Sequence, residues 1–266
     1  MYVFDRSTPV TVSLRLQRGT AEVVAENRPD AQVEIIAEDG ADDDRFTVAL
    51  EGDTLVVHAP ESTWNRRRTP KARVQVRVPL DSALAAHSAA ADIRATGRWA
   101  SGQATVASAD VSVDEVTGDA YLKAASGDLT VGRIGGSLRI SSSSGDLRVG
   151  DVTGDVKADT ASGDITIRRV GGSLQTETAS GDVEIGALSR GKSRLNTASG
   201  DVSVGVAAGT GVWLDLNTAS GSTTSDLAMG GAAPQGTQEA TLELRVRTAS
   251  GDIDVHRAMG DLHAAA

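Results

Sequence analysis

Residues 160–185 read TASGDITIRRVGGSLQTETASGDVEI, and this stretch contains the repeat that organises most of the chain. ASGD occurs at 161–164 and again at 179–182, and related four-residue units recur in both directions. Their fourth residues are 110, 128, 146, 164, 182, 201, 222 and 252, so the steps are 18, 18, 18, 18, 19, 21 and 30. Glycines divide the first steps into halves of nine residues. A fixed short period predicts a repeat architecture.

Each half-repeat predicts one short β-strand. Apolar and polar residues alternate after the turn, as in the segments Ile165–Ile167 and Val183–Ile185. The other half-repeat alternates in the same way around Leu174. Period two with one polar face is typical of a half-buried strand. A further inward column consists of small residues, namely Ala124, Ser142, Thr160, Thr178, Thr197, Thr218 and Thr248.

These patterns predict an all-β fold, a parallel β-solenoid with about 18 residues and two strands per coil. Equivalent residues of successive coils are expected to stack about 4.8 Å apart, so about eight coils extend the body by roughly 40 Å. We expect a right-handed coil, because parallel crossover connections have that hand. Two thin sheets closed over small and aliphatic residues leave little room for rings, which agrees with an aromatic content of 3% and with 29 glycines.

The sequence of residues 1–80 predicts β-strands that do not follow the 18-residue repeat. The expected hairpin turn is Glu51-Gly52-Asp53. We expect this region to cap the first coil, because an uncovered end exposes strand edges. The predicted organisation is therefore a β cap at 1–80 and solenoid repeats at 81–266 in one continuous unit, with a protruding loop at 228–240. The expected strands of the cap are Val10–Leu16, Thr20–Ala25, Gln32–Ala37, Arg45–Leu50, Thr54–Ala59 and Arg73–Val78.

The composition excludes several kinds of site and partner. With no cysteine, the chain has neither disulfides nor thiolate metal ligands. The four histidines show no metal-ligand spacing, and we expect no metal and no cofactor. The net charge of −10 argues against nucleic acid as a partner. The histidines are His58, His87, His256 and His263.

The ends and the hydropathy of the chain bear on its location. The first residues, MYVFDRSTPVTVSLRL, lack a basic segment followed by an apolar run. No stretch approaches the roughly 18 apolar residues of a membrane span. We expect a cytoplasmic protein, exported only if a leader has been removed.

One segment matches a nucleotide-binding motif. Residues 186–193, GALSRGKS, fit the Walker A pattern from Gly186 to Ser193. A P-loop needs a helix after the glycine loop, with its N-terminus toward the phosphates. The next residues, RLNTASGDVSV, are another β half-repeat. We therefore interpret both glycines as corners of the repeat and expect no nucleotide to bind.

The repeat places aspartates in one column. Like charges about 4.8 Å apart repel, so each carboxylate needs a hydrogen bond or a cation. One interpretation is a calcium-stabilised β-roll, although the aspartate directly precedes the inward residue, which is the wrong parity for that site. The preferred interpretation is that each aspartate accepts backbone N–H bonds in its turn, as in Asx turns. The column comprises Asp110, Asp128, Asp146, Asp164, Asp182, Asp201 and Asp252.

A basic loop is the main candidate for an interaction surface. In TWNRRRTPK, Trp64 lies beside Arg66, Arg67 and Arg68. An aromatic ring and three guanidinium groups can grip phosphate or carboxylate. A solvated loop between two strands explains the same residues, since short charge runs are usually exposed.

A β-helix protein that binds or cleaves polysaccharide is the main alternative. It needs paired carboxylates and aromatic platforms for the sugar rings. Outward acids are present, but the tryptophans are too scattered to predict a row of subsites. No constellation of serine, histidine and acid stands out in the sequence to predict a catalytic triad. The acids are Asp159, Glu177 and Glu184, and the tryptophans are Trp64, Trp99 and Trp213.

Two features together resemble a known family. The stretch PVTVSLRLQRGTAEVVAENRPDAQVEI, followed by reiterated TASGDI/V units, is similar to the bacterial "putative adhesin", toast-rack-like β-repeat domains of unknown function. The resemblance covers nearly the whole chain. It implies a stacked β-repeat protein without catalytic residues, and it links some members to cell-envelope stress. We therefore expect a non-enzymatic scaffold that binds another protein or itself.

Overall fold

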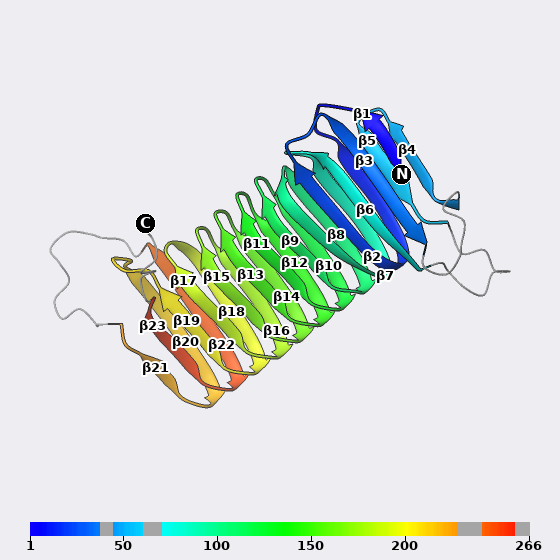
Figure 1. Ribbon diagram of the computed structural model, residues 1–266. Helices are drawn as coiled ribbons and strands as arrows, with labels where there is room; N and C mark the ends of the chain where they lie inside the picture. Colours follow the sequence, from blue (N-terminus) through cyan, green and yellow to red (C-terminus); the bar gives the residue numbers. More distant parts are fainter. Residues whose placement is uncertain (38–44, 61–70, 228–240, 259–266) are drawn as a thin grey trace.

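In the computed structural model, two parallel sheets face each other along an elongated stack of coils (Figure 1). The structure describes residues 1–37, 45–60, 71–227 and 241–258. Within these residues the regular elements are strands, and there is consequently no long apolar helix that could cross a membrane. The predicted all-β parallel solenoid is confirmed, whereas the hand of the coil stays a prediction.

We call the two faces sheet I and sheet II. The long strands β2 (Thr11–Glu26) and β7 (Ala83–Trp99) run around a corner and contribute to both sheets. In spatial order, sheet I contains β4 (Thr47–Glu51), β5 (Thr54–His58), the first part of β2, the first part of β7, β8 (Ser101–Ser108), β10 (Ala120–Ser126), β12 (Leu138–Ser144), β14 (Val156–Ser162), β16 (Leu174–Ser180), β18 (Gly191–Ser199), β22 (Leu242–Ser250) and β20 (Val212–Ser220).

Sheet II follows the same coils. It contains β1 (Tyr2–Asp5), β3 (Asp30–Ala37), β6 (Lys71–Pro79), the second parts of β2 and β7, β9 (Val111–Val116), β11 (Leu129–Ile134), β13 (Leu147–Val152), β15 (Ile165–Val170), β17 (Val183–Leu188), β19 (Val202–Val206), β23 (Ile253–Arg257) and β21 (Thr223–Ser225). Across the regular coils each residue pairs with its equivalent in the next repeat, as the period of the sequence predicts.

The core lies between the two sheets and consists of stacked aliphatic columns. Ile165 and Ile167 are fully buried, and the equivalent residues of the other regular coils are buried as well. Small residues fill the narrow corner beside them, where Thr160 and Thr178 are buried. Trp99 is also fully buried, and its indole N–H donates to the carbonyl of Thr96 at 3.1 Å.

The N-terminal region continues the stack. β2 forms one coil, and β5 and β6 together form a second coil outside it. The strands β1, β3 and β4 then add antiparallel edges. The predicted hairpin is present, because β4 and β5 pair across Gly52, whose φ is 59°. β1 and the fusion of two expected strands into β2 were not predicted.

The last two coils lie in an order that the sequence does not suggest. β22 pairs with β18 on one side and with β20 on the other, so the coil of residues 242–257 lies inside the coil of residues 212–225. The same order holds in sheet II, where β23 lies between β19 and β21. The last step of the repeat is the longest, and it gives the chain enough length to return. The loop expected at 228–240 lies outside the described residues.

Candidate functional site

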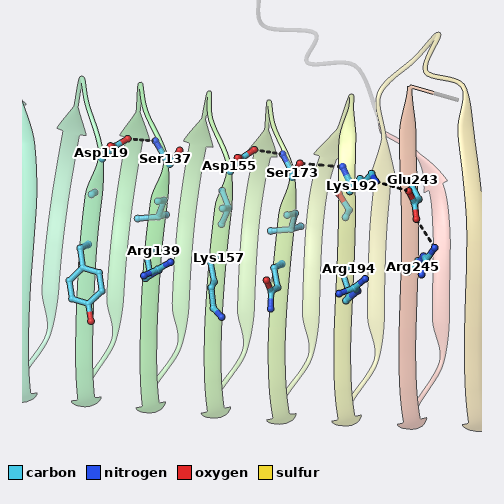
Figure 2. Close-up of a pocket in the computed structure, with 17 residues that line it drawn as sticks. Asp119, Ser137, Arg139, Asp155, Lys157, Ser173, Lys192, Arg194, Glu243 and Arg245 are labelled. Carbon is cyan, nitrogen blue, oxygen red and sulfur yellow. Dashed lines mark hydrogen bonds and ion pairs between the residues drawn. The ribbon is translucent and has the colours of Figure 1, made fainter. Parts of the chain in front are cut away.

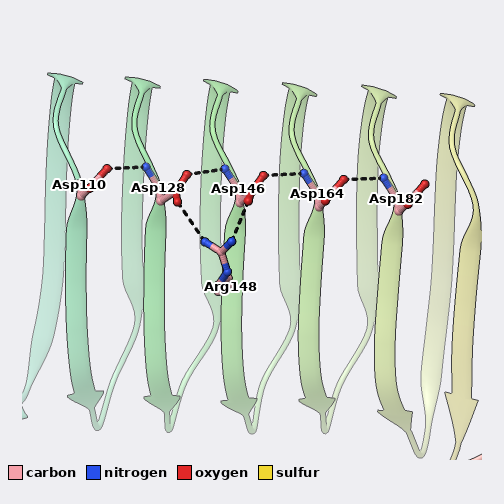
Figure 3. Close-up of polar contacts among 6 residues, drawn as sticks. All are labelled: Asp110, Asp128, Asp146, Arg148, Asp164 and Asp182. Carbon is pink, nitrogen blue, oxygen red and sulfur yellow. Dashed lines mark hydrogen bonds and ion pairs between the residues drawn. The ribbon is translucent and has the colours of Figure 1, made fainter.

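Stacking in register turns the repeat into columns of exterior side chains, which are the candidate sites of this protein. The column of aspartates lies at the corner before sheet II and is shown in Figure 3. A second set covers the outer face of sheet I and is shown in Figure 2.

The aspartates form a continuous hydrogen-bonded ladder between coils. In each step one carboxylate oxygen accepts the backbone N–H of the equivalent residue in the next coil, as between Asp146 and Asp164 at 3.0 Å. The expected hydrogen bonding to backbone N–H groups is thus present, but the donor belongs to the next coil and not to the same turn. The ladder runs from Asp92 through Asp110, Asp128, Asp146, Asp164, Asp182, Asp201 and Asp252 to the N–H of Ser222, with distances of 2.7 to 3.1 Å.

Arginine and backbone dipoles compensate part of the ladder's charge. Arg148 bridges two rungs, with 3.1 Å to Asp128 and 2.7 Å to Asp146 (Figure 3). The N–H of Asp146 and then Arg148 lower the pKa of Asp128. At the end of the ladder, the N–H and the hydroxyl of Ser222 lower the pKa of Asp252. Hydrogen bonds to the charged form therefore hold these carboxylates ionised.

The calcium interpretation finds no ligand cluster to support it. Among the residues that the structure describes, no group of three or more His, Asp or Glu side chains could hold a metal ion. The ladder uses one oxygen of each carboxylate for the backbone, which leaves a single row of outer oxygens. This geometry favours a structural role for the column.

The outer face of sheet I carries a long shallow trough of about 780 Å³. It crosses strands β10, β12, β14, β16, β18 and β22 (Figure 2). Backbone N–H groups of Ser137 and Ser173 donate to Asp119 and Asp155 along one rim, each at 2.7 Å. The row of side chains on the floor is Tyr121, Arg139, Lys157, Gln175, Arg194 and Arg245.

Charges of both signs meet in this trough and directly beside it. Lys157 lies 3.5 Å from Asp159, and Arg245 lies 2.8 Å from Glu243. Burial raises the pKa of Asp159 above its ordinary value, although Lys157 opposes the effect. At one end Trp213 is 46% exposed, and its ring centroid lies 5.3 Å from the guanidinium carbon of Arg245. This contact is a cation–π pair on an open face.

Several predicted candidates fall elsewhere. Trp64, Arg66, Arg67 and Arg68 lie outside the described residues, and Trp99 is part of the core. The outward acids divide between the two faces, with Glu184 on sheet II and the register neighbours Asp159 and Glu177 on sheet I. Tyr121 and Trp213 share sheet I but lie six strand spacings apart, about 29 Å. They do not form a row of sugar platforms.

The motif at 186–193 continues as a strand. Gly186 is in β17, and β18 begins at Gly191 and runs through Ser193. The side chain of Ser193 points into the core, where it is buried, and Lys192 lies 3.9 Å from Glu243. The motif therefore lacks the helix that a P-loop requires.

One serine–histidine contact was missed from the sequence. Ser13 Oγ and His58 Nε2 are 3.0 Å apart because β2 and β5 pair in parallel. Burial, and then the charge of Arg15, lower the pKa of His58. In the described part of the chain, the other ring nitrogen of His58 has no carboxylate partner, so the pair lacks the orienting acid of a triad. The two positions are far apart in the sequence, which leaves no local signal for the contact.

Fold and surface together define a class of protein: a parallel β-solenoid with hydrogen-bonded corner ladders and an open sheet face. A family model described as Toastrack DUF4097 matches residues 11–263, and the chain belongs to this family. The predicted resemblance is confirmed.

Several solved structures are similar to this chain at low identity. A "putative adhesin" from Bacteroides fragilis NCTC 9343 is 10% identical, with a TM-score of 0.51 over 96% of this chain and 95% of that one. A "putative adhesin" from Parabacteroides distasonis ATCC 8503 is 12% identical, with a TM-score of 0.47 over 95% and 97%. A "putative lipid binding protein" from the same organism is 13% identical, with a TM-score of 0.44 over 96% and 95%. No curated protein matches the chain.

Proposed function

We propose that this chain is a non-enzymatic interaction protein that presents the outer face of sheet I to a protein partner. The observation that carries the proposal is the trough of about 780 Å³, which six parallel strands line with side chains in fixed register. Its arginines and Tyr121, with Trp213 on the neighbouring strand β20, are of the types enriched in protein interfaces. A rigid sheet also loses little conformational entropy when a partner binds.

The adhesin names of the structural neighbours agree with an interaction role, and they are descriptions of those proteins. The self-association expected from the sequence is a second form of the interaction role, in which the exposed ends of two stacks join head to tail and the trough takes no part. The cytoplasmic location stays a prediction, which fractionation of the source cells would test.

The proposal is tested by affinity capture from the source cell lysate with two matched variants. R139S/K157S removes two cations from the trough, and T130E/T166E adds two acids to the exposed face of sheet II, so both change the net charge by −2. We expect the wild type and T130E/T166E to retain the same partner, and R139S/K157S to lose it. Equal retention by both variants would contradict the role of sheet I. Absence of any partner, with a monomer by light scattering, would contradict the interaction role itself.

One observation favours the polysaccharide alternative. Asp159 and Glu177 are register neighbours on one face, and the raised pKa of Asp159 is a property of a general acid. However, one oxygen of Asp159 is fully shielded from solvent. Release of reducing sugar from acidic or neutral polysaccharides, abolished in D159N, would establish this alternative. Its absence from wild-type protein would remove the cleavage part.

A further inference from the structure

The C-terminal end of sheet I contains a cluster of three arginines. Arg194 on β18 is the register neighbour of Arg245 on β22, and Arg247 is the neighbour of Asn196. Figure 2 shows Arg194 and Arg245 side by side on their strands. These four residues line a second, smaller hollow of about 180 Å³ at the β18–β22 end of the trough. Three guanidinium groups and one amide therefore surround one small hollow.

The charge of this patch is opposite to that of the whole chain. The outward residues of β18, β22 and β20 include the cations Lys192, Arg194, Arg245 and Arg247, and the acids Glu243 and Asp215. Four positive and two negative charges give +2 locally, in a chain whose net charge is −10. Like charges on neighbouring strands repel each other. The patch therefore carries a net positive charge in a molecule whose net charge is negative.

The central guanidinium is held in place on two sides. Arg245 donates to Glu243 at 2.8 Å, and it stacks on Trp213. Its Nε–H is shielded from solvent and has no hydrogen-bond partner among the described residues. Arg194 and Arg247 are exposed and form no ion pair within the described part of the chain. One arginine is therefore preorganised, and its two neighbours are free to close on a ligand.

We propose that Arg194, Arg245 and Arg247, with Asn196, form a binding site for a tetrahedral oxyanion of the phosphate or sulfate class. Planar guanidinium groups donate in pairs to such oxygens, and hydrogen bonds between charged groups are about twice as strong as neutral ones. The amide of Asn196 adds a neutral donor. The hollow of about 180 Å³ has room for one such anionic group. This site adjoins the protein-binding surface proposed above, because Arg194 and Arg245 also line the β18–β22 end of the trough.

The test is isothermal titration calorimetry of the full chain with inorganic phosphate and with sulfate, against chloride at the same ionic strength. We expect saturable one-site binding of phosphate or sulfate and none of chloride. R194A/R247A should weaken binding at least tenfold, because two of three charged donors are lost. R139A is the matched control, since it removes an exposed arginine from the same sheet three strand spacings away, about 14 Å. It should change the affinity less than twofold.

Two outcomes would overturn the proposal. The first is no binding of either anion by the wild type at up to about 10 mM, which would place Kd above the millimolar range. The second is equal weakening by R139A and R194A/R247A. Circular dichroism and the melting temperature confirm that the variants fold.

A second experiment distinguishes the sources of the anion. Sedimentation with phosphatidylglycerol vesicles but not phosphatidylcholine vesicles, lost in R194A/R247A, assigns the group to a lipid. Phosphate binding without vesicle binding assigns it to a soluble ligand.

Discussion

At the scale of the residue, the glycine of each SGD turn is fixed by the neighbouring coil. Gly163 has a φ of 145°, which L side chains rarely adopt. A Cβ at this position would lie 2.2 Å from the carbonyl oxygen of Gly145 in the preceding coil. Both the backbone conformation and the close approach of two main chains therefore require glycine.

Gly163→Ala is expected to destabilise the fold by more than about 3 kcal/mol, because a strained backbone alone costs about 1–3 kcal/mol and the clash adds to it. Gly52→Ala is the control, since Gly52 also has positive φ but has open space around it. It should cost about 1–2 kcal/mol, the penalty for an L side chain in the left-handed conformation. Urea unfolding of both variants measures the difference, and equal losses would show that the inter-coil contact is not what selects glycine.

Asp159 gives a prediction on pH. Burial raises the pKa of Asp159 above 3.8. The equivalent residue in the preceding coil is Ser141, so serine fits this position of the repeat. A carboxylate with a raised pKa weakens the folded state at pH above its folded pKa, and this penalty vanishes as the pH falls below 3.8. Asp159→Ser should therefore raise the free energy of unfolding at pH 7 by about 0.5 kcal/mol, since the exposed contact with Lys157 contributes little. The gain should disappear at pH 3. A gain that is equal at both pH values would disprove the role of ionisation.

At the scale of the element, the corner ladder couples each coil to the next. The carboxylate of Asp146 accepts the N–H of Asp164 at 3.0 Å. We therefore expect the acceptor oxygen of this side chain to contribute more to stability than its negative charge. Asparagine keeps that oxygen and relieves repulsion along the column, whereas alanine leaves the N–H without its partner.

Asp146→Ala should lower the free energy of unfolding by about 1–3 kcal/mol, the range for an N–H donor that loses its partner. Asp146→Asn should lose less than half as much, although both variants lose the ion pair with Arg148. Chemical denaturation of the two variants in parallel checks this ordering. Equal losses would mean that the ion pair, not the hydrogen bond, stabilises the corner.

The individual strands could be predicted from the sequence because the period of two is local. Alternation around Ile165 or Leu174 places each residue inside or outside without knowledge of its partner strand. The ladder column could be predicted from the constant period of the repeat. The N–H group that donates to each aspartate could not be predicted, because the choice of donor depends on how the corners of neighbouring coils are placed against each other. The Ser13–His58 contact and the arginine cluster depend on strand partners that are distant in the sequence, which no local pattern reveals.

At the scale of the whole molecule, both ends of the stack have the same arrangement. The coil of β2 lies between β7 and the coil of β5 and β6, and the coil of β22 and β23 lies between its neighbours in the same way. The coil that comes first in the sequence is thus covered by the later coil of β5 and β6, and the coil that comes last is covered by the earlier coil of β20 and β21. The repeat could not predict this order, because equivalent turns offer nearly identical edges to any neighbour. Only the long connections at each end indicate that the chain leaves the simple sequence of coils.

The order of the coils is also what brings Arg245 beside Arg194, so it underlies both the fold and the proposed anion site. Disulfide formation tests it directly, since the chain has no cysteine of its own. Ser199 pairs with Ser250 in register, and adjacent parallel strands lie within the roughly 4.4–6.8 Å Cα range of a disulfide. We predict that S199C/S250C oxidises rapidly in the folded protein and that S199C/S220C, two strands apart, does not. Rapid oxidation of S199C/S220C with none in S199C/S250C would contradict the inserted coil.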